Sequence, residues 1–320
     1  MNAPFNPTHI QPSIIQNTES MDFAAAACDF QNESFIDNAH AHIAQLPEAV
    51  RQAIADFHKK PHKSGALLIK GLPVGQLPDT PATPTTPTAK DCTSELTLLT
   101  IAKTLGEPIG YEPELGGRII QNILPTKTAS TRQVSTSSKV SLMFHTEAAF
   151  HPHRPAYLLL LCLKGDPAAS TTLASIREVL PLLSSAAVET LFQARFRTAV
   201  DESYLHGREN ILGEPVPVLS GELDCPSMVF DADLLVGMAV AAQRALAELS
   251  RAVATCHTSV CLESGDLLIV DNAVAVHGRS PFTPRFDGTD RWLQRTFVVA
   301  DLTASAKERV GRVISTEFGL

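Results

Sequence analysis

The chain has 320 residues, of which 44% are apolar and 19% charged, so it can bury a sizeable core, and disorder along its whole length is excluded. Lysine and arginine total 26 against 34 aspartate and glutamate residues, and the formal net charge of −8 argues against nucleic acid as a partner. The longest apolar run, residues 156–163, is far shorter than the roughly 20 residues of a membrane span, and no signal-peptide pattern is present, so a soluble cytoplasmic protein without a membrane partner is expected.

The N-terminal part of the chain predicts a loose arm followed by a helix and a strand. Residues 1–38 mix Pro, Asn, Gln and Ser with little periodicity, which indicates an arm without regular structure. Apolar side chains at helical spacing behind Pro47 predict an amphipathic helix over residues 47–60. A strand is expected next, over residues 66–71.

A proline-rich segment and a second helix follow. Residues 78–88 contain four prolines, which exclude a helix or central strand and predict a surface loop. Beyond this loop, Ser94 is expected to be the N-cap of a helix, and Gly106 is expected to end it.

From residue 118 onward, short β-prone runs separated by turn residues predict many strands. One long helix is expected to interrupt them, from Leu234 to about Ser250. Many short strands in one stretch favour a sandwich or barrel over a doubly wound parallel sheet. We therefore expect a mainly β fold with flanking α-helices, in a single domain over residues 1–320. The β-prone runs are residues 118–124, 157–163, 170–174, 195–200, 227–230, 258–262, 266–271 and 292–299.

Several familiar site motifs are absent from the sequence. It contains no Gly-x-Gly-x-x-Gly, no P-loop, no Gly-x-Ser-x-Gly and no His-Glu-x-x-His, so dinucleotide-binding, P-loop, α/β-hydrolase and zincin functions lose their support. The six cysteines include no Cys-x-x-Cys pair of the kind that suggests zinc or a redox dithiol, and they are expected to be reduced thiols.

The segment FHTEAAF contains the strongest candidate metal ligands. His145 and Glu147 are two residues apart, so on a strand their side chains point to the same face and can bind one ion. The best third ligand is His277, which follows an apolar run where a strand is expected to end. Two histidines and one carboxylate leave open metal positions, as in non-haem Fe(II) oxygenases. His-x-Glu alone is weak evidence, because the pattern is common by chance.

Arg291 strengthens the oxygenase interpretation. It lies fourteen residues after His277, where a C-terminal strand could carry its guanidinium back beside that ligand. A guanidinium binds a carboxylate through two parallel N–H bonds, as the distal end of 2-oxoglutarate requires. The alternative is a surface salt bridge.

With these residues in place, the sequence resembles the clavaminate synthase-like branch of the Fe(II)/2-oxoglutarate oxygenases over residues 64–302, and especially the viomycin-pathway arginine β-hydroxylase group. The resemblance implies a distorted jelly roll, or double-stranded β-helix, with Fe(II) as cofactor and 2-oxoglutarate and O2 as cosubstrates. It implies that His145, Glu147 and His277 bind iron, and that Arg291 binds the 2-oxoglutarate C5 carboxylate. The matching segments are GALLIKGLPV, FHTEAAFHPHRPAYLLLLCLKGDP, STTLA, SGDLLIVDNAVAVHG and FDGTDRWLQRTFVV.

Two more residues near these motifs receive roles from the resemblance. Thr172 matches a threonine whose hydroxyl assists the C5 carboxylate, although it could also be an ordinary strand threonine beside Thr171. Arg295 shares a strand face with Arg291 and matches an arginine that holds the carboxylate of an amino-acid substrate. Its alternative role is to neutralise an acidic residue on the rim.

The remaining candidates concern the substrate. Asp231 and Asp233 match an Asp-x-Asp in arginine hydroxylases whose carboxylates receive the guanidinium, whereas the alternative is an N-cap of the following helix. Gln133 and Ser135 match a strand that contacts the amino-acid main chain, and Gln121 matches an amide near the α-amino group.

Together these features predict a hydroxylase of a free basic L-amino acid, with arginine first and lysine, ornithine or citrulline second. Desaturation or a second oxidation stays open, because these outcomes differ from hydroxylation only by small shifts of the target C–H. A non-catalytic jelly-roll binding protein is the alternative from another class, and the intact set His145, Glu147, His277 and Arg291 argues against it. His151 and His153 are expected to lie outside the metal's direct ligands.

Overall fold

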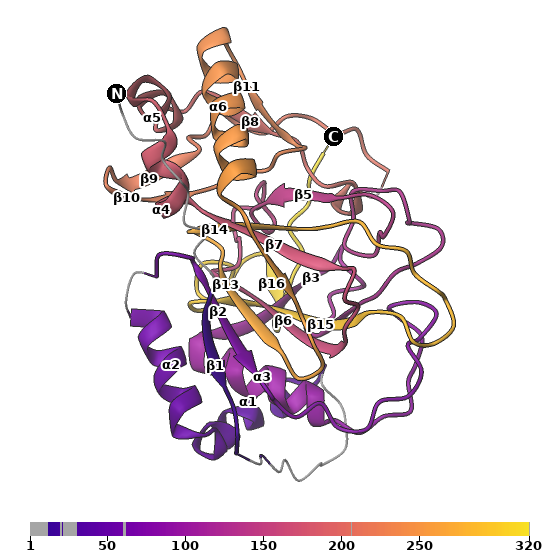
Figure 1. The fold of residues 1–320 in the computed structure, drawn as a ribbon. Coiled ribbons are helices and arrows are strands. Elements are labelled where there is room, and N and C mark those ends of the chain that lie inside the picture. The colour runs from indigo at the N-terminus through magenta and orange to yellow at the C-terminus, as the bar shows by residue number, and fades with distance from the viewer. Residues whose placement is uncertain (1–11, 20, 22–30, 60–61, 206, 320) are drawn as a thin grey trace.

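The computed structural model describes residues 12–19, 21, 31–59, 62–205 and 207–319 (Figure 1). Two β-sheets lie against each other and enclose an apolar core to which both contribute. Leu68 and Leu160 come from the larger sheet, and Leu173 and Ala275 come from the smaller one. The mainly β prediction is therefore confirmed.

The larger sheet contains nine strands of the described chain. Strand β4 (Gln121–Ile123) pairs only with β15 and lies beside the main path. The order along that path is β1 (Ser13–Gln16), β2 (Ala66–Lys70), β13 (Leu267–Asp271), β6 (Tyr157–Lys164), β15 (Trp292–Val299), β3 (Glu107–Tyr111), β17 (Val313–Ile314) and β16 (Arg309–Val310).

The smaller sheet contains four strands of the described chain, in the order β12 (Thr258–Cys261), β7 (Ser170–Ser175), β14 (Ala275–Arg279) and β5 (Leu142–His145). A short turn, residues 272–274, joins β13 to β14 and so carries the chain from the larger sheet to the smaller one. Two further strand pairs lie apart from these sheets: β9 (Leu219–Glu222) with β10 (Cys225–Met228), and β8 (Phe196–Thr198) with β11 (Leu235–Gly237).

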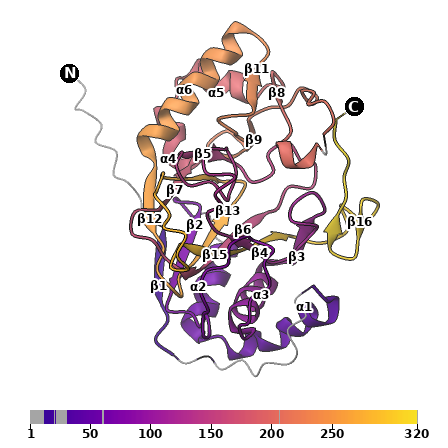
Figure 2. The ribbon, with the colours of Figure 1, turned by 90° about the vertical axis from the view of Figure 1, so that its right-hand side faces the viewer.

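Helices cover the outer face of each sheet (Figures 1 and 2). Leu67 and Ile69 alternate with Leu68 along β2, and they pack with α2 and α3 outside the larger sheet. Ala174 and Val276 of the smaller sheet pack with α6 in the same way. The helices are α1 (Glu33–Ala39), α2 (Glu48–Lys59), α3 (Thr93–Leu105), α4 (Ile176–Val179), α5 (Ser185–Leu191) and α6 (Val240–Cys256), with short 3-10 helices η1 (His40–Gln45), η2 (Leu180–Leu182) and η3 (Glu202–Tyr204).

Helices α2 and α3 and the loop between them follow the prediction. Residues 78–88 contain neither helix nor strand, and Gly106 caps the end of α3. The predicted N-cap of α3 is wrong, because the cap position is Cys92 and Ser94 lies inside the first turn. Ser94 is buried there and accepts a hydrogen bond from Lys90 Nζ at 2.7 Å.

Three other sequence-based expectations need correction. The helix predicted from Leu234 begins at Val240, because residues 235–237 instead form β11 against β8. Two segments of the predicted loose arm form regular structure, since β1 adds a parallel strand to the edge of the larger sheet and α1 packs on the core; residues 1–11 lie outside the described part. Cys92 is disulfide-bonded, so the expectation of reduced thiols is wrong for this residue.

Within the described residues, no helix combines the length and apolar character of a membrane span.

Candidate functional site

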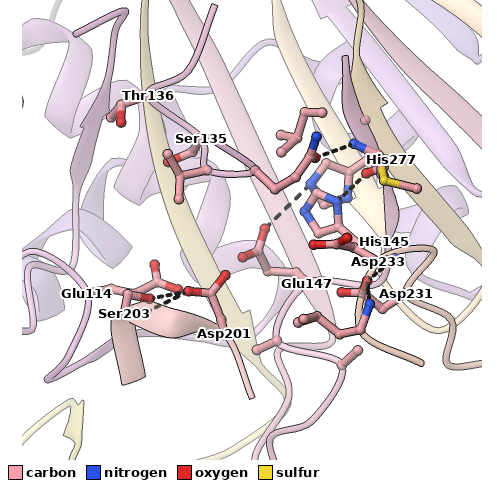
Figure 3. Close-up of a pocket in the computed structure, with 18 of the residues that line it drawn as sticks. Glu114, Ser135, Thr136, His145, Glu147, Asp201, Ser203, Asp231, Asp233 and His277 are labelled. Atoms are coloured by element: carbon pink, nitrogen blue, oxygen red, sulfur yellow. Dashed lines mark hydrogen bonds and ion pairs between the residues drawn. The ribbon is translucent and has the colours of Figure 1, made fainter. Parts of the chain in front are cut away.

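The three predicted metal ligands meet at the end of the smaller sheet (Figure 3). His145 ends β5, and His277 lies directly opposite it on β14. One donor atom from each of His145, Glu147 and His277 lies within 4.8 Å of the others, and no second group of this kind occurs among the described residues. Glu147 lies in the turn after β5, so the predicted strand geometry does not explain its placement. The turn brings it to His277, whose Nε2 lies 3.5 Å from Glu147 Oε2.

The surroundings favour the protonation states that bind a metal ion. His145 donates its Nδ1–H to the carbonyl of Met143 at 2.8 Å, which leaves Nε2 as a ligand atom. Burial raises the pKa of Glu147, but Arg295, His277 and His145 outweigh this effect and lower it to about 2. Burial and the neighbouring His145 lower the pKa of His277 to about 4. The site therefore offers the Glu147 carboxylate and the neutral His277 imidazole to a metal ion, and the Nε2 atom of His145 lies beside them.

This donor set fits Fe(II). Glu147 Oε2 is buried and makes no hydrogen bond to the described protein, so it has a free position for an ion. Two imidazoles and one carboxylate on one side of a metal leave the opposite positions open for exogenous ligands.

Arg291 lies immediately before β15 and faces the same cavity, which has a volume of about 580 Å³. Its side chain is buried, and its Nη2 donates to Thr171 Oγ1 at 3.3 Å. Burial lowers the pKa of Arg291, so an anion bound at this guanidinium would gain a strong, charge-assisted interaction.

The structure places Thr171, and not the predicted Thr172, beside Arg291. Neighbouring residues on a strand point to opposite faces, and Thr171 lines the cavity. Thr172 pairs with Gly278, and a Cβ on that glycine would lie 2.9 Å from Thr172 Oγ1. Because the predicted residue is one position later on the strand, its side chain points away from Arg291.

Arg295 is buried among acidic and amide groups. Its Nη2 forms an ion pair with Glu114 at 2.6 Å, and its Nη1 lies 3.4 Å from Glu147 Oε1. Gln121 lies opposite Arg295 in the sheet and accepts a hydrogen bond from its Nε at 3.0 Å. Arg295 and Glu114 line the cavity. Gln121 lies behind Arg295 and is not among the described lining residues.

Asp231 and Asp233 line the cavity next to His145 (Figure 3). Asp231 Oδ1 accepts hydrogen bonds from the N–H groups of Asp233 and Leu234, both at 2.8 Å. This aspartate therefore caps the turn before β11 and not α6. Its second oxygen remains available, and burial raises the pKa of Asp231.

Sequence reasoning missed Glu114, Asp201 and Ser203, which also line the cavity. Tyr204 of η3 donates its hydroxyl to Glu114 at 2.9 Å, and Asp201 accepts a hydrogen bond from the Ser203 N–H at 2.9 Å. These residues lie in a loop or in the short η3, at no fixed spacing from the metal motif, so the sequence contained no signal for them.

Gln133 and Ser135 lie in the loop before β5, where a strand was predicted. The Gln133 amide donates to Ser141 O at 2.9 Å and accepts from Met143 N at 3.1 Å, so it attaches this loop to β5. Ser135 lines the cavity.

His151 and His153 do not join the candidate metal group. His151 is buried against Tyr111, and its Nδ1 accepts a hydrogen bond from the His153 N–H at 2.9 Å. Burial, together with His153, lowers the pKa of His151 to about 3.

Comparison with known proteins agrees with this geometry. Residues 38–297 match the family described as taurine catabolism dioxygenase TauD, TfdA family. The chain belongs to this family. It is 39% identical over 304 residues to the L-lysine 3-hydroxylase of Catenulispora acidiphila, a match that covers 93% of this chain and 85% of that relative.

Two solved structures are similar along almost the whole chain. An asparagine oxygenase in complex with Fe(II), 2S,3S-3-hydroxyasparagine and succinate has 36% sequence identity and a TM-score of 0.84, over 90% of this chain and 91% of that one. The non-heme iron oxygenase OrfP in complex with Fe, succinate and (3S)-hydroxy-L-Arg has 29% identity and a TM-score of 0.85, over 94% and 99%. The double-stranded β-helix is confirmed, and the chain is an Fe(II)/2-oxoglutarate-dependent oxygenase in a family of amino-acid hydroxylases.

Proposed function

We propose that the chain hydroxylates a free basic L-amino acid, with arginine as the first candidate and lysine as the second. The observation that carries this proposal is the acidic wall of the cavity, formed by Asp201, Asp231 and Asp233. None of the three forms an ion pair with another described residue. A cationic side chain that enters this cavity loses part of its water, and carboxylates compensate for that loss, because an unpaired buried cation is strongly unfavourable.

The opposite end of the proposed substrate meets a pair of opposite charges. Arg295 and Glu114 lie side by side in the cavity wall. A guanidinium suits the α-carboxylate of a free amino acid, and a carboxylate suits its α-ammonium group. We therefore assign the amino-acid head group to Arg295 and Glu114, with Gln121 holding Arg295 and with Gln133 and Ser135 in the adjoining loop.

The reaction centre lies between these two ends. We assign the iron ligands to His145, Glu147 and His277, and the distal carboxylate of 2-oxoglutarate to Arg291 and Thr171. Fe(II), 2-oxoglutarate and O2 supply the oxidising chemistry, whereas the protein orients the target C–H and excludes water. A small shift of that C–H would give desaturation, so product analysis is part of the test.

Lysine is the second candidate because the 39% identical relative is named L-lysine 3-hydroxylase. An ammonium and a guanidinium both suit the acidic wall, and the guanidinium adds directional N–H donors. The similarity to an asparagine oxygenase makes a neutral amide side chain the comparison that tests the charge argument.

The test supplies the purified protein with Fe(II), 2-oxoglutarate, O2 and one amino acid at a time. Arginine and citrulline form one matched pair, and lysine and norleucine form another, because each pair differs mainly in charge. We expect succinate release and the gain of one oxygen atom with the charged member of at least one pair. Turnover with citrulline, norleucine or asparagine alone would contradict a basic substrate, and no succinate with any amino acid would contradict the activity.

A further inference from the structure

A buried asparagine joins the two chain segments that carry the candidate metal ligands. Asn272 is 3% exposed and lies in the turn between β13 and β14. His277 follows five residues later on β14. The side chain of Asn272 reaches the separate turn that contains Glu147. Asn272 therefore lies in the hairpin that carries His277 and contacts the backbone of Glu147.

Two of the three hydrogen bonds of this side chain join it to the backbone of Glu147. Asn272 Oδ1 accepts a hydrogen bond from Glu147 N at 2.8 Å, and its Nδ2 donates to Glu147 O at 3.1 Å. The same Nδ2 donates to Pro155 O at 2.9 Å. A neighbouring strand would give Glu147 the same pair of backbone bonds, but β5 has already ended at His145. The Asn272 amide therefore takes the place of a ladder partner.

The turn around Glu147 needs such support. Ala148, the next residue, has φ of 49°, a left-handed conformation that is strained for a residue with a Cβ. On the other side, Thr146 N donates to Phe230 O at 2.7 Å and so holds the start of the turn. Without Asn272, a buried N–H and a buried carbonyl of Glu147 would lack partners, and the turn would relax to satisfy them.

The contacts of the Glu147 carboxylate are too long to fix its direction by themselves. Its Oε1 lies 3.4 Å from Arg295 Nη1, and its Oε2 lies 3.5 Å from His277 Nε2, which are both long contacts. The direction of this carboxylate is therefore set mainly from its backbone. We propose that Asn272 is a positioning residue that aims Glu147 at the ion shared with His277. This inference rests on the proposed set of iron ligands.

The test measures Co(II) binding to the metal-free protein, by anaerobic titration followed by visible absorption and calorimetry. Asn272→Asp keeps the size of the side chain and the acceptor for Glu147 N, but it replaces the donor to two carbonyls with an oxygen. Asn122→Asp is the matched control, because Asn122 accepts from Trp292 Nε1 at 2.9 Å, donates to Pro84 O at 3.3 Å and lies outside the cavity. The melting temperature of each metal-free variant reports the purely structural effect.

We expect Asn272→Asp to weaken Co(II) binding by about 10–100-fold and to change the Co(II) absorption spectrum, because residues behind a metal ligand have effects of this size. Asn122→Asp should lower the melting temperature without changing either metal readout. If Asn272→Asp does not fold, Asn272→Ser is measured in its place, with the same expectation.

Three results would overturn the inference. The first result is an Asn272 variant that binds Co(II) with wild-type affinity and absorption, while Glu147→Gln loses Co(II) binding. That result would leave the proposed ligand set intact and would remove the role of Asn272. The second is Co(II) binding by Glu147→Gln as strong as in the wild type, which would remove the ligand set and the inference together. Equal weakening of Co(II) binding by the two asparagine variants would also reduce Asn272 to a structural residue.

Discussion

At the scale of single residues, some charged groups of the cavity wall form ion pairs within the protein and others do not. Arg295 and Glu114 neutralise each other, and two other lining residues, Arg132 and Glu202, form an ion pair at 2.6 Å. Asp231, Asp233 and Arg291 lack such partners among the described residues. In the proposed function, the unpaired aspartates face the side chain of the amino-acid substrate, and the unpaired arginine faces the distal carboxylate of 2-oxoglutarate.

The double variant Asp231→Asn with Asp233→Asn tests the acidic end. Asparagine keeps the size and the capping oxygen of Asp231 but removes both charges, so the stability of the turn should change little. The KM for arginine or lysine should rise at least tenfold, equivalent to about 1.4 kcal/mol, and the KM for citrulline should rise less. An unchanged KM for both basic amino acids would contradict this role of the two aspartates.

The neighbouring threonines provide a matched pair for the cosubstrate end. Thr171→Val removes the hydroxyl beside Arg291, whereas Thr172→Val removes a hydroxyl on the other face of the same strand. We expect Thr171→Val to raise the KM for 2-oxoglutarate about tenfold, near the lower limit for a hydrogen bond to a charged group, and Thr172→Val to leave it within twofold. Initial rates at varied 2-oxoglutarate measure both, and the reverse order would restore Thr172.

At the scale of elements, the pairing of β5 with β14 assembles the metal site. The two strands come from distant parts of the chain, and Gly278 lies between the paired residues His277 and Arg279, where the register shifts. A Cβ on Gly278 would lie 2.6 Å from Leu142 O and 2.9 Å from Thr172 Oγ1, so the backbone of β5 would have to move and the Thr172 side chain would have to turn. The position of His145 relative to His277 thus depends on a glycine.

Gly278→Ala should therefore lower stability by about 1–3 kcal/mol and weaken Co(II) binding, because the added methyl group pushes β5 away from β14. Gly213→Ala is the control, since a Cβ there would lie 3.6 Å from Thr198 O, an ordinary contact distance. Chemical denaturation and Co(II) titration measure the two effects. Wild-type metal affinity in Gly278→Ala would show that the site tolerates movement of β5.

The sequence predicted these elements unevenly, for physical reasons. The apolar runs that became β6 and β13 were clear, because both faces of a central strand are buried and the run is almost continuously hydrophobic. The segment around Leu235 resembled a helix start, and only its pairing with β8 makes it a strand. Propensity does not encode such distant partners.

The candidate site was predictable in its chemistry and less so in its geometry. The sequence pointed to His145, Glu147, His277 and Arg291 because few residue types suit iron or a carboxylate, and the structure brings these four side chains to one cavity. Thr171 was missed because one residue of error on a strand reverses the face. Glu114 and the residues at η3 were missed because the path of the chain between the strands brings them to the cavity, and no sequence pattern encodes that path.

At the scale of the whole molecule, the metal group ties the smaller sheet to the loops around the cavity. The two histidines come from paired strands and Glu147 from a turn, so an ion held by the three proposed ligands would cross-link parts that are distant in sequence. A ligand that binds only the folded state stabilises it by about 2.7 kcal/mol at a concentration of 100 Kd.

Co(II) together with 2-oxoglutarate, without O2, should therefore raise the melting temperature of the wild type. The variants His145→Ala, Glu147→Ala and His277→Ala should lose this rise and also lose turnover, while their metal-free melting temperatures stay close to that of the wild type. Thermal melts with and without Co(II) measure the effect. A full rise in any of the three variants would remove that residue from the ligand set.

One measurement tests the central claim most directly. The purified protein receives Fe(II), 2-oxoglutarate and O2 with an equimolar mixture of the twenty common amino acids, and mass spectrometry identifies which of them gains an oxygen atom. We predict that arginine or lysine is oxidised first, with one succinate formed per oxidised amino acid. Oxidation of a neutral or acidic amino acid ahead of both would contradict the basic-substrate account.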